Sequence, residues 1–262
     1  MTTFADPARA DQRSGPQRPA RRLTATAAVL TTLARHAWFV EDEVLGLADL
    51  VTAGDVCIDI GAEYGLYTLA MAARVGSRGQ VHGIEPQPGA ARVLDAGVRL
   101  VGDRGTVRTH RVAFAEAPRR DVMSVPRRNG LPVHGRAFLT TGANAPGPNA
   151  TEFRSARWLP VEVTTLDAFC QAQDLDRVDF IKADVEGAEL KVLRGGMRTL
   201  RRHRPAVQLE IQDAHIAKYG TDARDVVGLL DELGYAMHVW GDGRWRPAER
   251  VTSARRNYLF VP

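Results

Sequence analysis

The sequence predicts an α/β protein with a doubly wound, mostly parallel sheet. Short apolar runs, of the kind buried in parallel sheets, alternate with stretches whose apolar residues repeat every three or four positions. A glycine-containing segment, DIGAEYGLYT, joins the first of these runs to the helix that follows it. Strict alternation of strands and helices is typical of a sheet with helices on both faces.

The predicted elements follow one another along the chain. Helices within residues 23–52 come first. We then expect strands at 56–60, 80–85, 106–112, 178–184 and 206–212, and helices at 66–75, 89–101, 187–194 and 222–234. The last two strands, at 235–240 and 256–261, have no helix between them, so we expect an antiparallel hairpin at one edge of the sheet.

Two segments do not fit this alternation. Residues 1–22 contain five arginines, three prolines and two aspartates, and we predict a disordered tail. Residues 116–160, within the main domain at 53–262, are rich in Gly, Pro, Asn and Arg and are too long for an ordinary connection. This excursion is either a substrate-contacting segment, which should affect the acceptor rather than the donor, or a disordered surface loop.

The composition excludes several classes of protein. Apolar residues make up 44% and charged residues 25%, as in an ordinary globular protein. We find no apolar run long enough to span a membrane and no signal peptide, so no membrane partner is expected. The tail supplies most of the formal charge of +4, so no nucleic-acid partner is expected either. Cys57 and Cys170 are the only cysteines, and Cys57 lies in an apolar run, which favours a reducing, cytoplasmic location.

The loop after the first strand is the first candidate site. Gly61 and Gly65 allow a sharp turn and a close approach of a ligand to the backbone. Asp59, at the end of the strand, is a candidate for binding an ammonium group. Glu85 ends the second strand, where Rossmann-type sites bind a ribose diol. The spacing D-x-G-x-x-x-G differs from the G-x-G-x-x-G of pyrophosphate-binding loops.

Polar residues on two later strands form a second candidate site. Phe180, Lys182 and Asp184 share one face of their strand because side chains alternate. We expect Lys182 to pair with Glu210 on the neighbouring strand, which leaves Asp184 at the carboxyl edge where such sheets bind ligands. A purely structural polar network is the alternative.

These motifs resemble those of the FkbM-family methyltransferases. GDVCIDIGAEYGLYTLA is similar to the family's GDxxxDxGANxGxxT, VHGIEPQP to its second motif, and IKADVEGAE to its most distinctive stretch, IKxDVEGxE. VEVTTLDAF resembles the family's segment before the fourth strand. RPAVQLEI and LGY follow IKADVEGAE in the family's order, so the resemblance spans roughly residues 39–240. Glu63 departs from the usual Asn, and GVRLVG lacks the asparagines common after the second helix.

The resemblance implies a class I methyltransferase fold, S-adenosylmethionine as methyl donor, and O-methylation of a small-molecule acceptor such as a sugar, glycolipid or secondary metabolite. Mapped onto this sequence, the expected donor contacts are Asp59, Gly61, Ala62, Glu63, Tyr64, Gly65, Thr68, Glu85, Pro86, Val112, Ala113 and Asp184. A hydroxyl acceptor gains from a base, and the candidates are Asp184, Glu210 and His215.

Three alternatives remain open at this point. Mg²⁺ held by Asp184 and Glu210 is another way to align the acceptor, but we predict no metal site. An NAD-dependent oxidoreductase would share the fold and the acid at Glu85, although the glycine spacing and IKADVEGAE disfavour it. A non-catalytic Rossmann-like binding module is suggested by Glu63.

Overall fold

The computed structural model describes residues 41–101, 105–144, 153 and 155–262. The predicted tail at 1–22, the predicted helical residues 23–40 and residues 145–152 of the excursion lie outside these ranges. The described part begins with helix α3 (Glu43–Gly46) and a 3-10 turn, η1 (Leu47–Asp49). Within it, no helix combines the length and the apolar character needed to cross a membrane.

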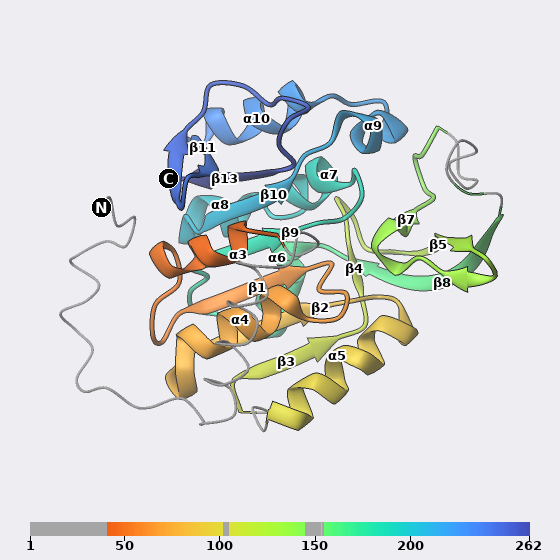
Figure 1. Cartoon of the computed structure of the whole chain (residues 1–262), viewed down its shortest axis with the longest axis horizontal. Coiled ribbons are helices and arrows are strands. Elements are labelled where there is room, and N and C mark those ends of the chain that lie inside the picture. The colour runs from red at the N-terminus through yellow and green to blue at the C-terminus, as the bar shows by residue number, and fades with distance from the viewer. Residues whose placement is uncertain (1–40, 102–104, 145–152, 154) are drawn as a thin grey trace.

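An eight-stranded sheet forms the centre of the molecule (Figure 1). The strand order is β12-β11-β13-β10-β9-β1-β2-β3. Its strands are β1 (Val56–Ile60), β2 (Gln80–Ile84), β3 (Val107–His110), β9 (Phe180–Ala183), β10 (Ala206–Glu210), β11 (Ala236–Gly241), β12 (Arg244–Pro247) and β13 (Asn257–Val261). The strands from β3 to β10 in this order are parallel, and the chain reverses its direction of winding at β1 and β9, where ligands bind in such sheets.

The C-terminal strands form the antiparallel end of the sheet. β11 pairs antiparallel with β13, which confirms the expected pairing of the last two predicted strands. β13 also pairs antiparallel with β10 and therefore lies between β10 and β11. The outermost strand, β12, was not predicted, because its four residues RWRP are too short and too charged to show alternation.

Helices cover both faces of this sheet. α4 (Leu66–Val75) and α5 (Pro88–Val101) lie on one face, and α6 (Leu166–Ala172), α7 (Glu189–Arg194), α8 (Met197–His203) and α10 (Ala223–Glu232) on the other. Alternation along β1 explains the two layers. Cys57 belongs to the apolar cluster that contains Met71 of α4, whereas Ile58 belongs to the cluster that contains Leu193 of α7.

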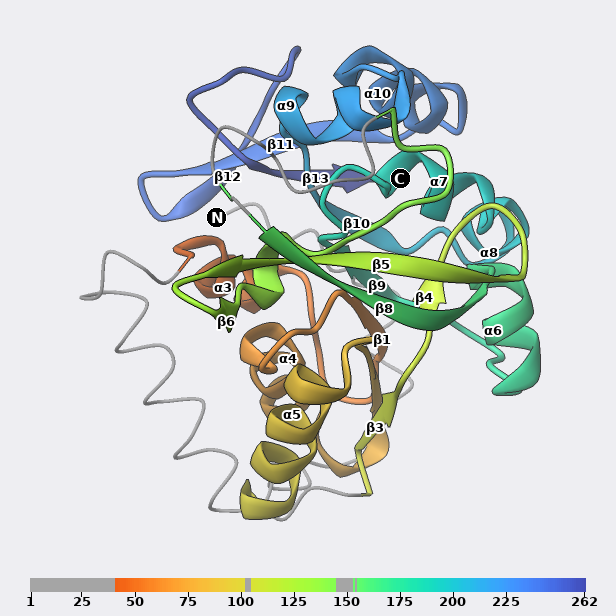
Figure 2. The ribbon, with the colours of Figure 1, turned by 90° about the vertical axis from the view of Figure 1, so that its right-hand side faces the viewer.

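The excursion carries a second sheet. Its strands are β4 (Ala113–Phe114), β5 (Arg119–Arg128), β6 (Leu131–Pro132), β7 (Phe138–Leu139) and β8 (Ser155–Thr164), with a 3-10 turn, η3 (His134–Arg136), between β6 and β7. β5 and β8 pair antiparallel over almost their whole length, and Met123, Val125 and Val161 help to form a small apolar core. Figure 2 shows this sheet lying across the carboxyl ends of the central strands. For the described residues, the alternative of a disordered loop is therefore wrong.

Candidate functional site

The loop after β1 lies against the end of β9. Gly61 has a φ of +80°, and a Cβ at this position would lie 2.0 Å from the backbone oxygen of Asp184. Only glycine permits both this conformation and this approach. Glu63 also has a positive φ, of 46°. The Asn that is usual at this position in the resembled family suits the conformation, because Asn tolerates left-handed backbone better than most residues.

Beside this loop lies a cavity, which we call the apolar cavity. It is bounded by the ends of β1, β2 and β9, by the segment before β4, and by the second sheet. The residues that line it include Gly61, Glu63, Ile84, Glu85, Pro86, Gln87, Val112, Ala113, Phe114, Met123, Ala137, Leu139 and Asp184. Most of its wall is apolar, and Glu85 supplies a carboxylate to it.

Glu85 is held by backbone donors. Its Oε2 accepts a hydrogen bond of 3.0 Å from the backbone N–H of Glu63, and its Oε1 accepts one of 2.8 Å from that of Gln87. The residue is only 3% exposed. Burial raises the pKa of Glu85 to about 7, although these hydrogen bonds act in the opposite direction. The predicted ribose-binding acid therefore lies at the cavity in a fixed orientation.

A second cavity, the acidic cavity, adjoins the first. It is lined by Glu41, Glu63, Tyr64, Pro132, Val133, His134, Gly135, Arg136, Asp184, Glu186, Glu210 and Arg256. Five of these side chains are carboxylic acids. Asp184 lines both cavities, so its carboxylate lies where they meet.

Asp184 pairs with the lysine on its own strand. The Nζ of Lys182 lies 3.0 Å from Oδ2 of Asp184 and over the ring of Tyr67. The predicted ion pair between Lys182 and Glu210 is wrong. The register of β9 and β10 places Gln208 opposite Lys182, and Gln208 donates a hydrogen bond to the hydroxyl of Tyr67.

The carboxyl groups of Asp184 and Glu210 are hydrogen-bonded to each other. Burial by itself would raise the pKa of Asp184, but the charge and the hydrogen bond of Lys182 lower it. Burial raises the pKa of Glu210 to about 9, and the charge of Asp184 raises it further in the same direction. At neutral pH the proton of this pair therefore resides on Glu210, and Asp184 is the ionised acid.

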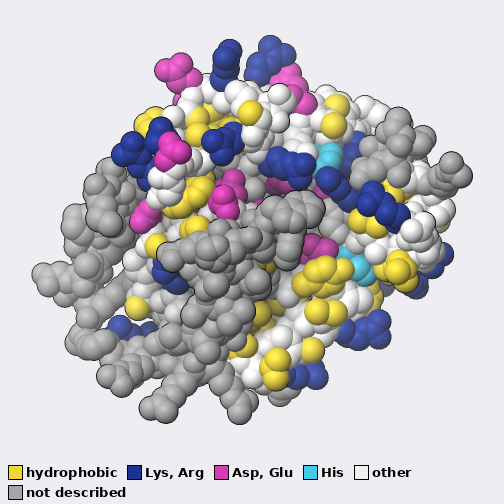
Figure 3. Space-filling model, in the orientation of Figure 1, with side chains coloured by type: hydrophobic (Ala, Val, Ile, Leu, Met, Phe, Trp, Pro, Cys, Tyr) yellow, Lys and Arg dark blue, Asp and Glu magenta, His cyan; other side chains and the backbone are white. Residues whose placement is uncertain are grey.

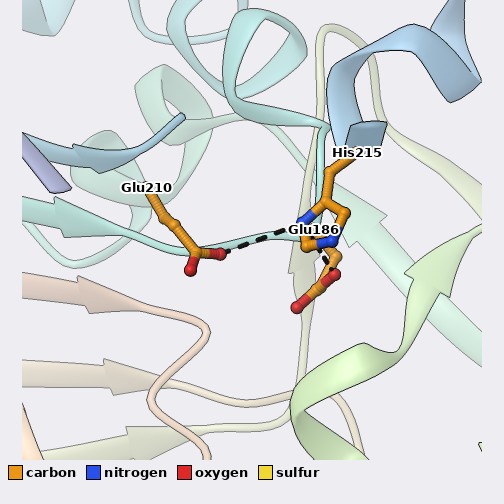
Figure 4. Close-up of side chains that lie close together, drawn as sticks. All are labelled: Glu186, Glu210 and His215. Carbon is orange, nitrogen blue, oxygen red and sulfur yellow. Dashed lines mark ion pairs between the residues drawn. The ribbon is translucent and has the colours of Figure 1, made fainter. Parts of the chain in front are cut away.

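His215 lies between two glutamates, as Figure 4 shows. Its Nδ1 is 3.0 Å from Oε2 of Glu186 and 4.0 Å from Oε2 of Glu210. Its Nε2 is 3.0 Å from the guanidinium of Arg136. Because arginine only donates, Nε2 must accept, and Nδ1 carries the proton of the neutral ring. Burial, with the charges of Lys218 and Arg136, lowers the pKa of His215 to about 4. Of the three predicted bases, His215 thus has no free lone pair for a substrate.

Several predicted donor contacts lie away from both cavities. Asp59 is 1% exposed, and its Oδ2 accepts a hydrogen bond of 2.5 Å from the hydroxyl of Thr68, which is itself buried. These two residues therefore connect β1 to α4. The other oxygen of Asp59, Oδ1, has no hydrogen-bond partner among the described residues, and the ammonium contact at Asp59 stays a prediction. Ala62 is also buried, and Gly65 lies against Leu94 of α5. Tyr64 lines only the acidic cavity.

Several residues that the sequence prediction did not include line these cavities, among them Gln87, His134, Arg136 and Glu186. The side chain of Gln87 lies 2.7 Å from Nδ1 of His134 and donates to its backbone oxygen at 3.0 Å. These bonds tie the second sheet to the end of β2. The position of Gln87, two residues after Glu85, was a signal for it, whereas nothing in the local sequence marks His134 or Arg136.

The second sheet contributes to both cavities. Met123, Ala137 and Leu139 line the apolar cavity, and Arg136 lines the acidic one. The expectation that the excursion would affect only the acceptor therefore does not agree with the geometry. Figure 3 shows a row of basic side chains and a histidine beside acidic side chains near the middle of the molecular face.

The order of these features along the chain agrees with a known family. The family model of the methyltransferase FkbM domain matches residues 59–237. The chain belongs to this family. S-adenosylmethionine is the family's methyl donor, so the resemblance based on the motifs is confirmed, and a nicotinamide is not the expected cosubstrate. Among curated protein sequences, none matches the chain.

A solved structure from the same family shows the same fold. The FkbM-family protein resembles methyltransferase FkbM from Methylobacillus flagellatus KT, with a TM-score of 0.51 and 16% identity over 87% of this chain and 48% of that one. The chain thus spans about half the length of that relative. Aeropyrum pernix fibrillarin with bound S-adenosyl-L-methionine gives a TM-score of 0.43 and 17% identity over 81% and 67% of the two chains. The O-methyltransferase from Bacillus cereus in complex with SAH gives a TM-score of 0.44 and 12% identity over 97% of this chain and 96% of that one. The predicted class I methyltransferase fold is confirmed.

The apolar cavity fits the donor of this family. A buried carboxylate, Glu85, lines a mostly apolar space, which suits a ribose diol next to an adenine ring. The loop approaches the end of β9 so closely at Gly61 that there is no room for a side chain at this position. The carboxylate and the apolar wall of this cavity therefore agree with an adenosine-containing ligand.

Proposed function

We propose that this protein is an S-adenosylmethionine-dependent O-methyltransferase that acts on a hydroxyl of a small molecule, such as a sugar or another secondary metabolite. In this proposal the apolar cavity holds the donor and the acidic cavity holds the acceptor. The observation that carries it is the position of Asp184, an ionised carboxylate that lines both cavities. A hydroxyl placed in the acidic cavity would meet a proton acceptor next to the donor site.

In this proposal Glu85 binds the methyl donor, and Asp184 acts on the acceptor. Glu85 accepts hydrogen bonds from the ribose hydroxyls, and the apolar wall contributed by Val112, Phe114 and Leu139 encloses the adenine. Bound S-adenosylmethionine supplies a methyl group that is already activated as part of a sulfonium. The protein then has mainly to align the acceptor oxygen and to accept its proton.

Asp184 is suited to accept that proton. Lys182 holds its Oδ2 at 3.0 Å and keeps it ionised, and Glu210 donates its own proton to it in a hydrogen bond. In this proposal the acceptor oxygen would bond to the methyl carbon, the carbon–sulfur bond of the donor would break to leave a neutral thioether, and the O–H proton would pass to the carboxylate of Asp184. Glu210, as a neutral acid whose one proton is donated to Asp184, adds no negative charge beside the acceptor oxygen.

Two measurements test the proposal. Calorimetry on the full chain should show binding of S-adenosylhomocysteine and no binding of NAD. Incubation with S-adenosylmethionine and a panel of sugars, glycosides and phenols, set against matched amines, should give O-methylated products by mass spectrometry. Binding of NAD but not of S-adenosylhomocysteine, or methylation of the amines alone, would refute the proposal.

A further inference from the structure

Two glutamates that line the acidic cavity, Glu186 and Glu210, form with the adjacent His215 a cluster that resembles a metal site. Glu186, Glu210 and His215 each offer one atom, and these atoms all lie within 4.8 Å of one another (Figure 4). Both glutamates are buried. Two carboxylates and an imidazole are common ligands of divalent metals. A cation in this cavity would lie close to the acceptor oxygen.

Arg136 already supplies a cation to this cluster. Its NH1 lies 3.0 Å from Nε2 of His215 and 3.5 Å from Oε1 of Glu186. Its side chain is 28% exposed, and it lines the acidic cavity. The guanidinium therefore contacts two of the three would-be ligands and also faces the space left for the acceptor.

The proton on His215 makes Arg136 and a metal incompatible. A neutral imidazole that binds a metal through Nδ1 carries its proton on Nε2. That N–H would then point at the N–H of Arg136, and two donors would face each other at 3.0 Å. With Arg136 in place, Nδ1 keeps its proton, and the nearest carboxylate oxygen to it is Oε2 of Glu186 at 3.0 Å.

The charges around the cavity are paired by the protein itself. Asp184 pairs with Lys182 at 3.0 Å, and Glu186 pairs with Arg136 at 3.5 Å and with Lys218 at 3.9 Å. Glu210 is hydrogen-bonded to Asp184 through a shared proton. Three of the five carboxyl groups that line the cavity, among them both glutamates of the cluster, thus already have partners within the protein.

The second sheet holds Arg136 in this position. Arg136 ends the turn η3, which begins at His134, and His134 is hydrogen-bonded to Gln87 at the end of β2. The arginine therefore comes from the excursion and is fixed to the strand that carries Glu85.

We propose that Arg136 takes the place of a divalent metal in the acceptor site. Its guanidinium provides the positive charge and the directed donors that hold the acceptor oxygen beside Asp184, and the site binds no divalent cation. This inference rests on the proposed function, since it assigns the acidic cavity to the acceptor. It makes Arg136 a substrate-positioning residue from a segment far from the family's motifs.

The experiment uses Mn²⁺ as the probe and the full chain. We would measure Mn²⁺ binding by electron paramagnetic resonance for the wild type, R136M, and the double variant R136M/E186Q. R120M is the matched control, because Arg120 lies on β5 of the same sheet with a side chain that is 89% exposed. Melting temperature and affinity for S-adenosylhomocysteine are measured for each protein.

We expect no Mn²⁺ binding by the wild type or R120M. R136M should bind Mn²⁺ at least about tenfold more tightly than the weakest binding that the measurement could detect in the wild type, because a unit positive charge next to the ligands has been removed. The gain should disappear in R136M/E186Q. Mn²⁺ binding by the wild type, or a folded R136M without the gain, would overturn the inference.

A second measurement does not depend on the variants. Long-range nitrogen–proton spectra of the wild type should show His215 protonated at Nδ1 and unprotonated at Nε2, and the opposite tautomer would also overturn the inference. The proposed function fails separately, through a wild type that does not bind S-adenosylhomocysteine at all.

Discussion

The carboxylate of Glu85 accepts a hydrogen bond of 3.0 Å from the backbone N–H of Glu63. The acid at the end of β2 thus holds the loop after β1, across two neighbouring strands. Glu63 has an uncommon positive φ, which is unfavourable for a residue with a side chain. The hydrogen bond stabilises this backbone conformation. One side chain both shapes the loop and lines the apolar cavity.

Replacing Glu85 by alanine should therefore weaken the binding of S-adenosylhomocysteine. The loss of its acceptor contacts should reduce the free energy of binding by roughly 1.5–3 kcal/mol in calorimetry. Glu162→Ala is the control, since Glu162 lies on the second sheet with a side chain that is 66% exposed. Equal affinities for Glu85→Ala and the wild type would remove Glu85 from the donor site.

The same residue should make donor binding depend on pH. Burial raises the pKa of Glu85 to about 7, and only the ionised carboxylate accepts hydrogen bonds from both ribose hydroxyls. The affinity for S-adenosylhomocysteine should fall as the pH drops below about 7. Because one proton must leave Glu85 before the ligand binds, the affinity should fall roughly tenfold for each pH unit. Calorimetry across this range tests the expectation, and the slope should be absent in Glu85→Ala.

Asp184→Asn should be the most damaging single change for catalysis. It preserves the shape of the side chain but removes the proton acceptor, so kcat should fall by roughly 10²–10⁴-fold. Glu210→Gln, which replaces an acid that is neutral at pH 7, should have a smaller effect. Both are measured with the acceptor found in the panel, together with melting temperature and donor affinity. A normal kcat in Asp184→Asn shows that another group takes the proton.

His134→Ala should weaken both ligands. It removes the 2.7 Å hydrogen bond to Gln87 that ties the second sheet to β2, and the sheet lines both cavities. We expect roughly a five- to tenfold loss of affinity for S-adenosylhomocysteine, the cost of one hydrogen bond, and a higher KM for the acceptor. If only the acceptor's KM changes, the wall of the apolar cavity does not depend on this bond.

The buried His82, which stacks on the half-buried His110, should make the protein sensitive to acid. Their rings are stacked, with Nδ1 of His82 3.1 Å from Nε2 of His110. Burial, together with the nearby His110 and Arg108, lowers the pKa of His82 to about 4. Between about pH 6.5 and 4 the unfolded chain binds a proton that the folded protein does not, so stability falls as the pH falls.

His82→Phe should remove part of this loss, because it keeps an aromatic ring in contact with Phe169 without a titrating group. The test is the melting temperature at pH 7 and at about pH 5 for both proteins. An equal drop in the two would mean that His82 does not contribute to the acid sensitivity.

Much of the central sheet could be predicted because its pattern is local. The bounds of β1 and α4 agree with the predicted ones, since a short apolar run followed by glycines and a helical period shows in neighbouring residues. Glu85 and Asp184 were found for the same reason: each lies at the end of a predicted strand.

The second sheet could not be predicted in this way. β5 reads RRDVMSVPRR, in which arginines and a proline hide the alternation, and its partner β8 lies some 30 residues further along the chain. Pairing over such a distance leaves no local signal. Arg136 and His134 were missed as a consequence. Asp59 was predicted to bind the ligand because strand-end acids often do; Thr68 of α4 donates a hydrogen bond to its Oδ2, a contact that the sequence pattern did not indicate.

The position of β13 has a consequence for how the chain folds during synthesis. β11 is joined to the rest of the central sheet only through β13, which is made after it. While a ribosome has not yet released residues 257–261, β10 has an open edge and the hairpin of β11 and β12 has no place to dock. The nascent protein therefore exposes an unpaired strand edge until β13 has left the ribosome, the condition under which chaperones and aggregation compete with folding.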